Sequence, residues 1–122
     1  MKTITSDDFL DALSLKAAKT RRPEGVTFEL TYGCNLRCVH CYNPTHRALP
    51  HELATSEICA FLKQIADFGV LTVTFTGGEP SVRPDIGEIL HYARRQGLMI
   101  HLMTNATRMT TSFTDLLQEV GV

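Results

Sequence analysis

The sequence predicts an α/β fold in which about three parallel βα units form part of a barrel. Strand-like runs alternate with helical patterns along the chain, and this order is typical of parallel strands joined by right-handed crossovers. Each strand-like run also alternates apolar with polar residues, so one face should pack on helices while the other meets something polar. A barrel with helices outside and a polar lumen satisfies both observations, as does an open two-layer sheet with one solvated face.

The composition is that of a single domain of ordinary polarity. Of the 122 residues, 43% are hydrophobic and 20% are charged, with a formal net charge of -1. The chain thus has no basic footprint for nucleic acid or an anionic membrane, and no run reaches the roughly 18 apolar residues of a spanning helix. The acidic N-terminus, with Asp7, Asp8 and Asp11, lacks the apolar segment of a signal peptide. We therefore expect a cytoplasmic protein that partners neither nucleic acid nor membrane.

The first segment, residues 1–24, predicts a short helix followed by a polar turn. Ser6 is the expected N-cap, and the turn ends at Pro23. We expect this helix to pack on the outside of the main domain, residues 25–122. Its apolar residues are Phe9, Leu10, Leu13 and Ala17.

The first βα unit begins with a strand over Val26–Thr31. A helix is expected from about Ser56 to Phe68, with Thr55 as its N-cap and Gly69 as its stop. Its apolar face consists of Ile58, Phe61, Leu62, Ile65 and Phe68.

Two further units follow the same pattern. The second strand, Val70–Thr76, is followed by a helix that starts near Pro84 and stops at Gly97. The third strand, Leu98–Thr104, precedes a last helix capped by Ser112. Residues expected to face the core are Leu71, Val73, Phe75, Ile86, Ile89, Leu90, Ala93, Leu98, Ile100, Leu102, Leu116, Leu117 and Val120.

Three of the four cysteines, Cys34, Cys38 and Cys41, stand close together after the first strand. Thiolates are the usual ligands of iron–sulfur clusters, and such tight spacing lets three of them converge on one cluster. Three ligands leave one iron of a four-iron cluster open, which suits chemistry better than a purely structural role. The motif also follows a strand, at the edge where barrel enzymes place their sites.

Other metal sites remain as alternatives at this point. His40 or His46 could complete a Cys3His zinc site, although the second cysteine pair of a zinc ribbon is absent. An electron-transfer cluster without catalysis is a further alternative, although neither bacterial nor plant-type ferredoxin spacing matches. The chain would then be a non-catalytic metal-binding module.

The Cys-x3-Cys-x2-Cys motif, followed after one helix by Gly77-Gly78-Glu79-Pro80, resembles the radical S-adenosylmethionine (radical SAM) superfamily. The resemblance implies a [4Fe–4S] cluster on Cys34, Cys38 and Cys41. In that family the open iron chelates S-adenosylmethionine, and one electron cleaves it reductively to a 5′-deoxyadenosyl radical that abstracts a substrate hydrogen. By the same resemblance, Gly77, Gly78, Glu79 and Pro80 would receive the amino group of S-adenosylmethionine, and His40 would lie beside the adenine.

The sequence around the motifs is similar to that of enzymes that mature peptides and cofactors, such as the pyrroloquinoline quinone, anaerobic sulfatase and haem-modification enzymes. The resemblance covers roughly residues 26 to 110 and implies the first half of a (βα)6 barrel. It also implies a peptide or small-molecule substrate and a low-potential electron donor of the flavodoxin or ferredoxin type. Later strands and auxiliary clusters would lie beyond residue 122, so the chain alone should be inactive or weakly active.

The remaining polar candidates are less specific. Cys59 is interpreted as a small apolar packing residue of its helix. Glu29, His101 and Asn105 fall on the polar side of their strands, where contact with substrate or cofactor competes with a structural role. The histidines expected to face solvent are His46, His51 and His91.

Overall fold

A computed structural model describes residues 5–122 as a parallel three-stranded sheet in the order β1-β2-β3, with helices after each strand. The α/β partial barrel predicted from the sequence is confirmed. The strands are β1 (Gly25–Thr31), β2 (Thr72–Gly77) and β3 (Met99–Leu102), and the helices are α1 (Ser6–Thr20), α2 (Thr55–Phe68), α3 (Ile86–Arg95) and α4 (Thr111–Val120), with a short 3-10 turn, η1, at Pro80–Val82.

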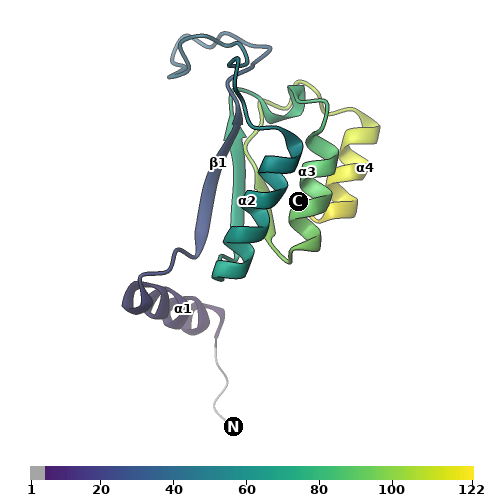
Figure 1. The fold of residues 1–122 in the computed structure, drawn as a ribbon. Helices are drawn as coiled ribbons and strands as arrows, with labels where there is room; N and C mark the ends of the chain where they lie inside the picture. The colour runs from purple at the N-terminus through teal and green to yellow at the C-terminus, as the bar shows by residue number, and fades with distance from the viewer. Residues whose placement is uncertain (1–4) are drawn as a thin grey trace.

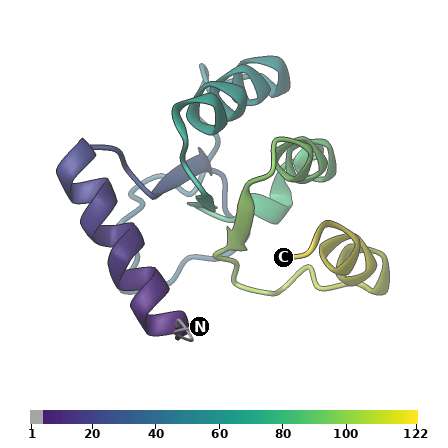
Figure 2. The same ribbon diagram turned by 90° about the horizontal axis from the view of Figure 1, so that it is seen from below.

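Helices α2, α3 and α4 all lie on one side of the sheet (Figures 1 and 2). The apolar residues of the strands point to that side, and Val73 and Phe75 of the central strand are fully buried there. Helices α2, α3 and α4 bury most of the apolar residues expected to face the core. The core consists of Leu30, Ile58, Leu62, Ile65, Val70, Val73, Phe75, Ile86, Ile89, Leu90, Ala93, Leu98, Ile100 and Val120.

The opposite face of the sheet is polar. Thr27, Thr74 and His101 are paired across the three strands, and Thr27 and His101 are exposed. The predicted alternation of the strands is therefore correct, and this face is the one that would line a barrel lumen. The β1–β2 register shifts between Glu29 and Thr31, which brings Thr31 opposite Gly77.

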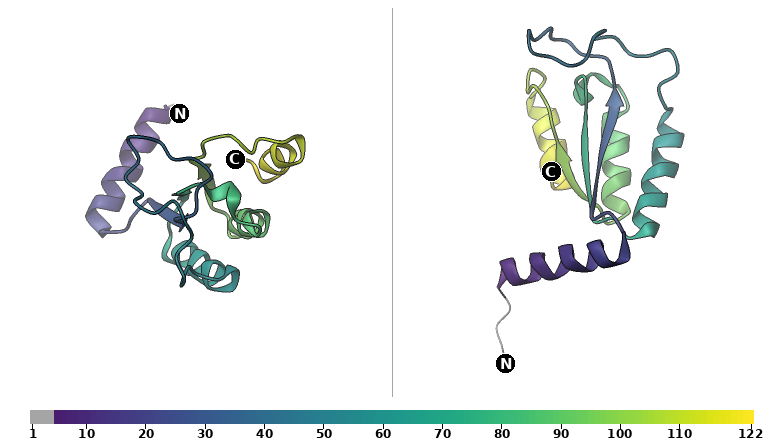
Figure 3. Two further views of the ribbon diagram at one scale, coloured as in Figure 1. Left: turned by 90° about the horizontal axis from the view of Figure 1, so that it is seen from above. Right: turned by 90° about the vertical axis from the view of Figure 1, so that its left-hand side faces the viewer.

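Helix α1 lies at the amino ends of the strands, below the sheet in Figure 1 and at the far end from the long loop in the right panel of Figure 3. None of its described side chains is buried, and Phe9 and Leu10 are more than half exposed. It lies outside the helical layer, and of the apolar residues predicted for it only Leu13 and Ala17 are half-buried, so close packing on the main domain stays a prediction. Residues 1–4 of the predicted segment lie outside the described residues. Within residues 5–122, none of the helices has the length and apolar character needed to span a membrane.

The helix starts differ from those predicted. Thr5 caps α1 in place of Ser6, and Thr110 caps α4 in place of Ser112, each with its hydroxyl oxygen accepting a backbone N–H. Ala54 occupies the N-cap of α2 in place of Thr55. The hydroxyl of Thr55 instead donates to Asp85 at 2.6 Å, so a tertiary contact has displaced the local one.

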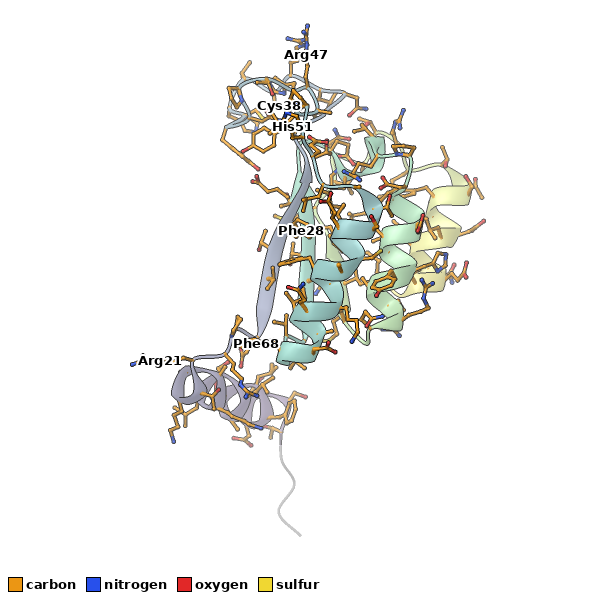
Figure 4. The ribbon with its side chains drawn as sticks, viewed as in Figure 1. Arg21, Phe28, Cys38, Arg47, His51 and Phe68 are labelled. Atoms are coloured by element: carbon orange, nitrogen blue, oxygen red, sulfur yellow. The ribbon has the colours of Figure 1, made fainter. Side chains whose placement is uncertain are left out.

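Two residues predicted to face the core are exposed. Leu71 precedes β2 and is not part of it, because the strand starts one residue later at Thr72. Phe68 is the last residue of α2, at the end of the helix near α1 (Figure 4). The guanidinium carbon of Arg22 lies 5.8 Å from the centroid of its ring.

Candidate active site at the carboxyl edge of the sheet

The cysteine loop, residues 32–54, connects β1 to α2 and lies over the carboxyl ends of the strands (Figures 1 and 3). Cys38 and Cys41 are exposed on it, whereas Cys34 is half-buried at its base. All four cysteines are free thiols. Cys38, Arg47 and His51 are seen on this loop above the end of the sheet in Figure 4.

Asn43 fixes the shape of the cysteine loop from inside. Its side chain is buried, donates to the Tyr32 carbonyl at 2.6 Å and accepts the backbone N–H groups of Thr45 and His46 at 3.1 Å each. The His46 carbonyl in turn accepts the Cys34 N–H at 3.2 Å. These bonds close the loop into a ring that returns residue 46 to the first cysteine.

A charged cluster beneath the loop ties its two ends to the fold. One carboxylate oxygen of Glu52 accepts the Thr31 hydroxyl at 3.0 Å and the Tyr32 N–H at 2.7 Å. Arg83 donates to both carboxylate oxygens of Asp85, at 2.9 and 2.6 Å, and to the Leu30 carbonyl at 3.0 Å.

The carboxylates of that cluster are held in their charged form. Burial by itself would raise the pKa of Glu52, but hydrogen bonds from the N–H groups of Tyr32 and Leu49, together with the Thr31 hydroxyl and Arg83, lower it below its usual range. The Arg83 guanidinium lowers the pKa of Asp85 in the same way. The cluster is therefore a fixed ionic support for the loop.

The Gly77-Gly78 pair packs against the backbone that leads into the loop. Gly77 has a φ of +127°, and a Cβ added there would lie 2.3 Å from the Thr31 carbonyl oxygen. A Cβ on Gly78 would lie 2.3 Å from the Gly33 oxygen. The close approach lets the Gly78 N–H donate to Thr31 at 2.7 Å and the Glu79 N–H donate to Gly33 at 2.9 Å.

Glu79 is fully buried, and its carboxylate joins the end of β2 to the end of β3. One oxygen accepts the Ser81 N–H, the Ser81 hydroxyl and the Thr104 hydroxyl at 3.0, 2.6 and 2.7 Å, and the other accepts the Asn105 N–H at 2.6 Å. Burial by itself would raise the pKa of Glu79, but these hydrogen bonds, first that of the Ser81 hydroxyl, lower it below its usual range.

Asn105 links the loop after β3 to the cysteine loop. Its side-chain nitrogen lies 2.9 Å from the Asn35 oxygen and 3.9 Å from the Cys34 sulfur. Asn35 also donates to Thr107 at 2.7 Å. Asn105, predicted on the polar side of the third strand, thus lies in the loop beyond β3, which ends at Leu102, and its side chain faces the first cysteine.

Glu29, on the exposed polar face of the sheet, meets Tyr42 of the cysteine loop. The Tyr42 hydroxyl donates to the Glu29 carboxylate at 2.7 Å, and this bond, with burial and the charge of Glu29, raises the pKa of Tyr42 to about 12. The predicted inward direction of Glu29 agrees with this face.

The structure brings most of the predicted site residues to one edge, but it does not gather the thiols around one point. Within residues 5–122, no three histidine, cysteine or acidic side chains are placed to hold a metal ion. His40 and His51 are exposed on the loop, while His46 and His91 are half-buried, contrary to the prediction for those two. Cys59 is half-buried on α2, away from the loop, and burial raises the pKa of its thiol.

Sequence reasoning missed the residues that support the loop, namely Asn43, Glu52, Arg83 and Asp85. The first two were detectable as polar residues among loop residues, yet nothing in their spacing predicts that they become buried. Arg83 and Asp85 flank Pro84, in the turn before α3, and in the sequence they resemble ordinary solvated charges.

The family profile of the radical SAM superfamily matches residues 28–122. The AdoMet-dependent heme synthase of Methanosarcina barkeri is 40% identical over 106 residues, which cover 86% of this chain and 30% of that protein. The PqqA peptide cyclase of Xanthomonas euvesicatoria is 40% identical over 101 residues, which cover 82% of this chain and 27% of that protein. The chain thus spans less than a third of the curated relatives it matches.

Solved structures share the fold at low sequence identity. The structure of Streptococcus suis SuiB bound to S-adenosylmethionine has a TM-score of 0.72 at 22% identity, covering 96% of this chain and 29% of that one. BtrN in complex with AdoMet and 2-DOIA has a TM-score of 0.63 at 17% identity, covering 82% and 43%. With the profile match over most of the chain and both motifs at one edge of the sheet, the chain belongs to the radical SAM superfamily.

Proposed function

We propose that this chain binds a [4Fe–4S] cluster through Cys34, Cys38 and Cys41 and, next to it, S-adenosylmethionine, as the first half of a radical SAM maturase. The observation that carries the proposal is the joint position of the three free thiols and the Gly77–Pro80 turn. Both lie at the carboxyl edge of one parallel sheet, although a helix separates them in the sequence. A simple electron carrier has no need of the second motif.

The three cysteines are suitable ligands for an iron–sulfur cluster. Three free thiols on one loop suit iron and sulfide, and the Cys34 sulfur already accepts the Leu36 N–H at 3.4 Å, a contact of the kind that surrounds cluster sulfurs. Since the thiols are not gathered here, we propose that cluster binding draws Cys38 and Cys41 toward Cys34. The cluster would supply the electron that cleaves S-adenosylmethionine.

The chain's own residues would bind and orient the cofactor. We propose that the turn from Gly77 to Pro80 receives the amino group of S-adenosylmethionine through backbone acceptors. The buried, negatively charged Glu79 keeps this turn in place and favours a cation beside it. His40, exposed on the same loop, would lie beside the adenine.

The relatives' names support a proposal for the substrate class. Relatives include a heme synthase, a peptide cyclase and the mycofactocin maturase MftC of Mycobacterium tuberculosis. We therefore propose that the full protein modifies a peptide or a cofactor precursor. The electron donor would be a low-potential flavodoxin or ferredoxin, and residues 32–51 carry Arg37 and Arg47 but no acidic residue, which favours an acidic donor.

The test is anaerobic reconstitution with iron and sulfide. We expect about four irons per chain, a broad visible absorbance that dithionite bleaches, and an altered spectrum of the reduced cluster when S-adenosylmethionine is added. Alanine in place of Cys34, Cys38 or Cys41 should abolish iron uptake. Cys59→Ala is the matched control, since this thiol belongs to α2 and not to the cysteine loop, and it should leave iron uptake unchanged.

Three results would contradict the proposal. Stoichiometric zinc without iron uptake would indicate the Cys3His alternative. A full cluster that persists in air and ignores S-adenosylmethionine would indicate complete protein ligation and an electron carrier. Loss of the cluster in Cys59→Ala would show that the ligands are assigned wrongly.

A further inference from the structure

The three proposed cluster ligands have different surroundings. Cys38 and Cys41 are exposed on the cysteine loop, whereas Cys34 is half-buried beside the loop that follows β3. The Cys34 sulfur accepts the Leu36 N–H at 3.4 Å and lies 3.9 Å from the side-chain nitrogen of Asn105. Asn105 lies far along the chain from this cysteine, so only the fold brings the two side chains together.

The orientation of the Asn105 amide is fixed by its partners. Its oxygen accepts both the N–H and the hydroxyl of Thr107, at 3.0 and 2.7 Å, so this atom cannot be the nitrogen. The nitrogen therefore points to Cys34 and to the Asn35 oxygen. The Asn105 backbone N–H is anchored as well, on the buried carboxylate of Glu79.

We propose that Asn105 is a positioning residue for the iron–sulfur cluster. Its side-chain amide holds Cys34 in place, and its N–H group raises the reduction potential of the cluster. This inference rests on the proposed function. A hydrogen-bond donor directed at a cluster sulfur stabilises the reduced cluster more than the oxidised one, because the reduced cluster carries an extra negative charge. Glu79 would then connect the two motifs, because it holds both the turn after β2 and the backbone of the residue that faces the first cysteine.

The experiment measures the midpoint potential of the reconstituted chain by a redox titration followed by electron paramagnetic resonance. Asn105→Leu removes the amide at similar size, and Asn105→Asp keeps an oxygen for Thr107 but turns a carboxylate toward the sulfur. We expect both to lower the potential, with Asp the more negative. A tenfold shift in the reduction equilibrium corresponds to about 59 mV for one electron.

Asn35→Leu is the matched control. It breaks the same Asn35–Asn105 hydrogen bond, and also the Asn35–Thr107 one, but leaves the Asn105 amide beside Cys34 with its oxygen still held by Thr107. If Asn105 served only to join the two loops, Asn35→Leu and Asn105→Leu would change the potential equally. We expect the wild-type potential in Asn35→Leu, together with faster loss of iron to a chelator in Asn105→Leu.

The outcomes separate this inference from the proposed function. A wild-type chain that takes up no iron overturns both. A wild-type chain that holds the cluster, with potentials unchanged in Asn105→Asp and Asn105→Leu, overturns the inference alone. Should Asn105→Leu fail to fold, the Asn105→Asp titration decides between the same two outcomes.

Discussion

The turn after β2 is shaped by two glycines, which allow a close backbone approach, and by a buried glutamate, which accepts hydrogen bonds. Gly77 and Gly78 allow β2 to approach the backbone of residues 31–33, where any side chain would collide. Glu79 then accepts hydrogen bonds from Ser81, Thr104 and Asn105. The motif that resembles a cofactor-binding sequence is therefore also the connection between the cysteine loop and the loop after β3.

Glu79→Gln should destabilise the fold. Both carboxylate oxygens of Glu79 now act only as hydrogen-bond acceptors, and in glutamine one of them becomes an NH2 group, which can only donate. At least one buried donor therefore loses its acceptor, at a cost of about 1–3 kcal/mol in the free energy of unfolding. Urea unfolding followed by circular dichroism measures the difference. Glu88→Gln, at an exposed position on α3, is the control and should change the free energy by less than about 0.5 kcal/mol. Equal stability of the two variants would refute the structural role of Glu79.

Gly78→Ala should also destabilise the chain, because the new methyl group would overlap the Gly33 and Tyr32 carbonyl oxygens. We expect a loss of about 1–3 kcal/mol and weaker retention of iron in the reconstituted chain. Gly87→Ala, on α3, is the matched control. Its methyl group would meet Leu116 at 3.4 Å, an ordinary contact, so this variant should be neutral or up to about 1 kcal/mol more stable. A stable Gly78→Ala would show that β2 can move away from the loop.

At the scale of elements, α2 connects the cysteine loop to the core and starts without a side-chain cap. Ala54 is the N-cap residue, and its N–H is satisfied by the Glu57 carboxylate at 2.8 Å. The Thr55 hydroxyl, which could have served as a cap, is bonded to Asp85. The start of α2 is thus fixed by the contact of Thr55 with the Arg83–Asp85 ion pair, and not by a local side-chain cap.

Ala54→Ser should stabilise this helix start. Ser would supply the acceptor for the first-turn N–H that Ala lacks, while Glu57 keeps its bond to the N-cap, and together they complete a capping box. We expect a gain of about 0.5–2 kcal/mol in the free energy of unfolding, measured by urea titration. Ala60→Ser, at an exposed position inside the same helix, should give no gain. Destabilisation in Ala54→Ser would show that the N-cap geometry differs from that described.

At the scale of the whole molecule, three partly or fully buried carboxylates join the elements at the carboxyl edge. Glu52, Glu79 and Asp85 all have a lowered pKa. A carboxyl group whose pKa is lower in the folded than in the unfolded chain contributes stability above its unfolded pKa. That contribution is lost as the pH falls through the folded pKa.

The free energy of unfolding should therefore be level near neutral pH and decrease below about pH 4.5, which is the ordinary pKa of the glutamates Glu52 and Glu79. Urea unfolding at a series of pH values measures this fall. Glu79→Gln should show a shallower fall than the wild type, because one of the three groups no longer titrates, whereas Glu88→Gln should follow the wild-type curve. A wild-type free energy that is flat down to pH 3 would contradict the assigned pKa directions.

The sequence by itself determined the fold class and the main site candidates. Alternating strands such as Val26–Thr31, helical periodicity and glycine stops are local patterns, so they predicted three parallel βα units and one polar sheet face. The same patterns misplaced helix starts by one or two residues, and at α2 the reason is that the Thr55 hydroxyl bonds the distant Asp85.

Only the tertiary structure decided which polar residues meet. The contacts of Arg83 with Leu30 and Asp85, of Glu79 with Asn105, and of Asn105 with Cys34 mostly join residues far apart in the sequence. No periodicity encodes such pairs, because they arise where parallel strands bring their carboxyl ends to one edge. The sequence therefore determined which residues can do the chemistry, and the packing of the strands decided which of them support one another.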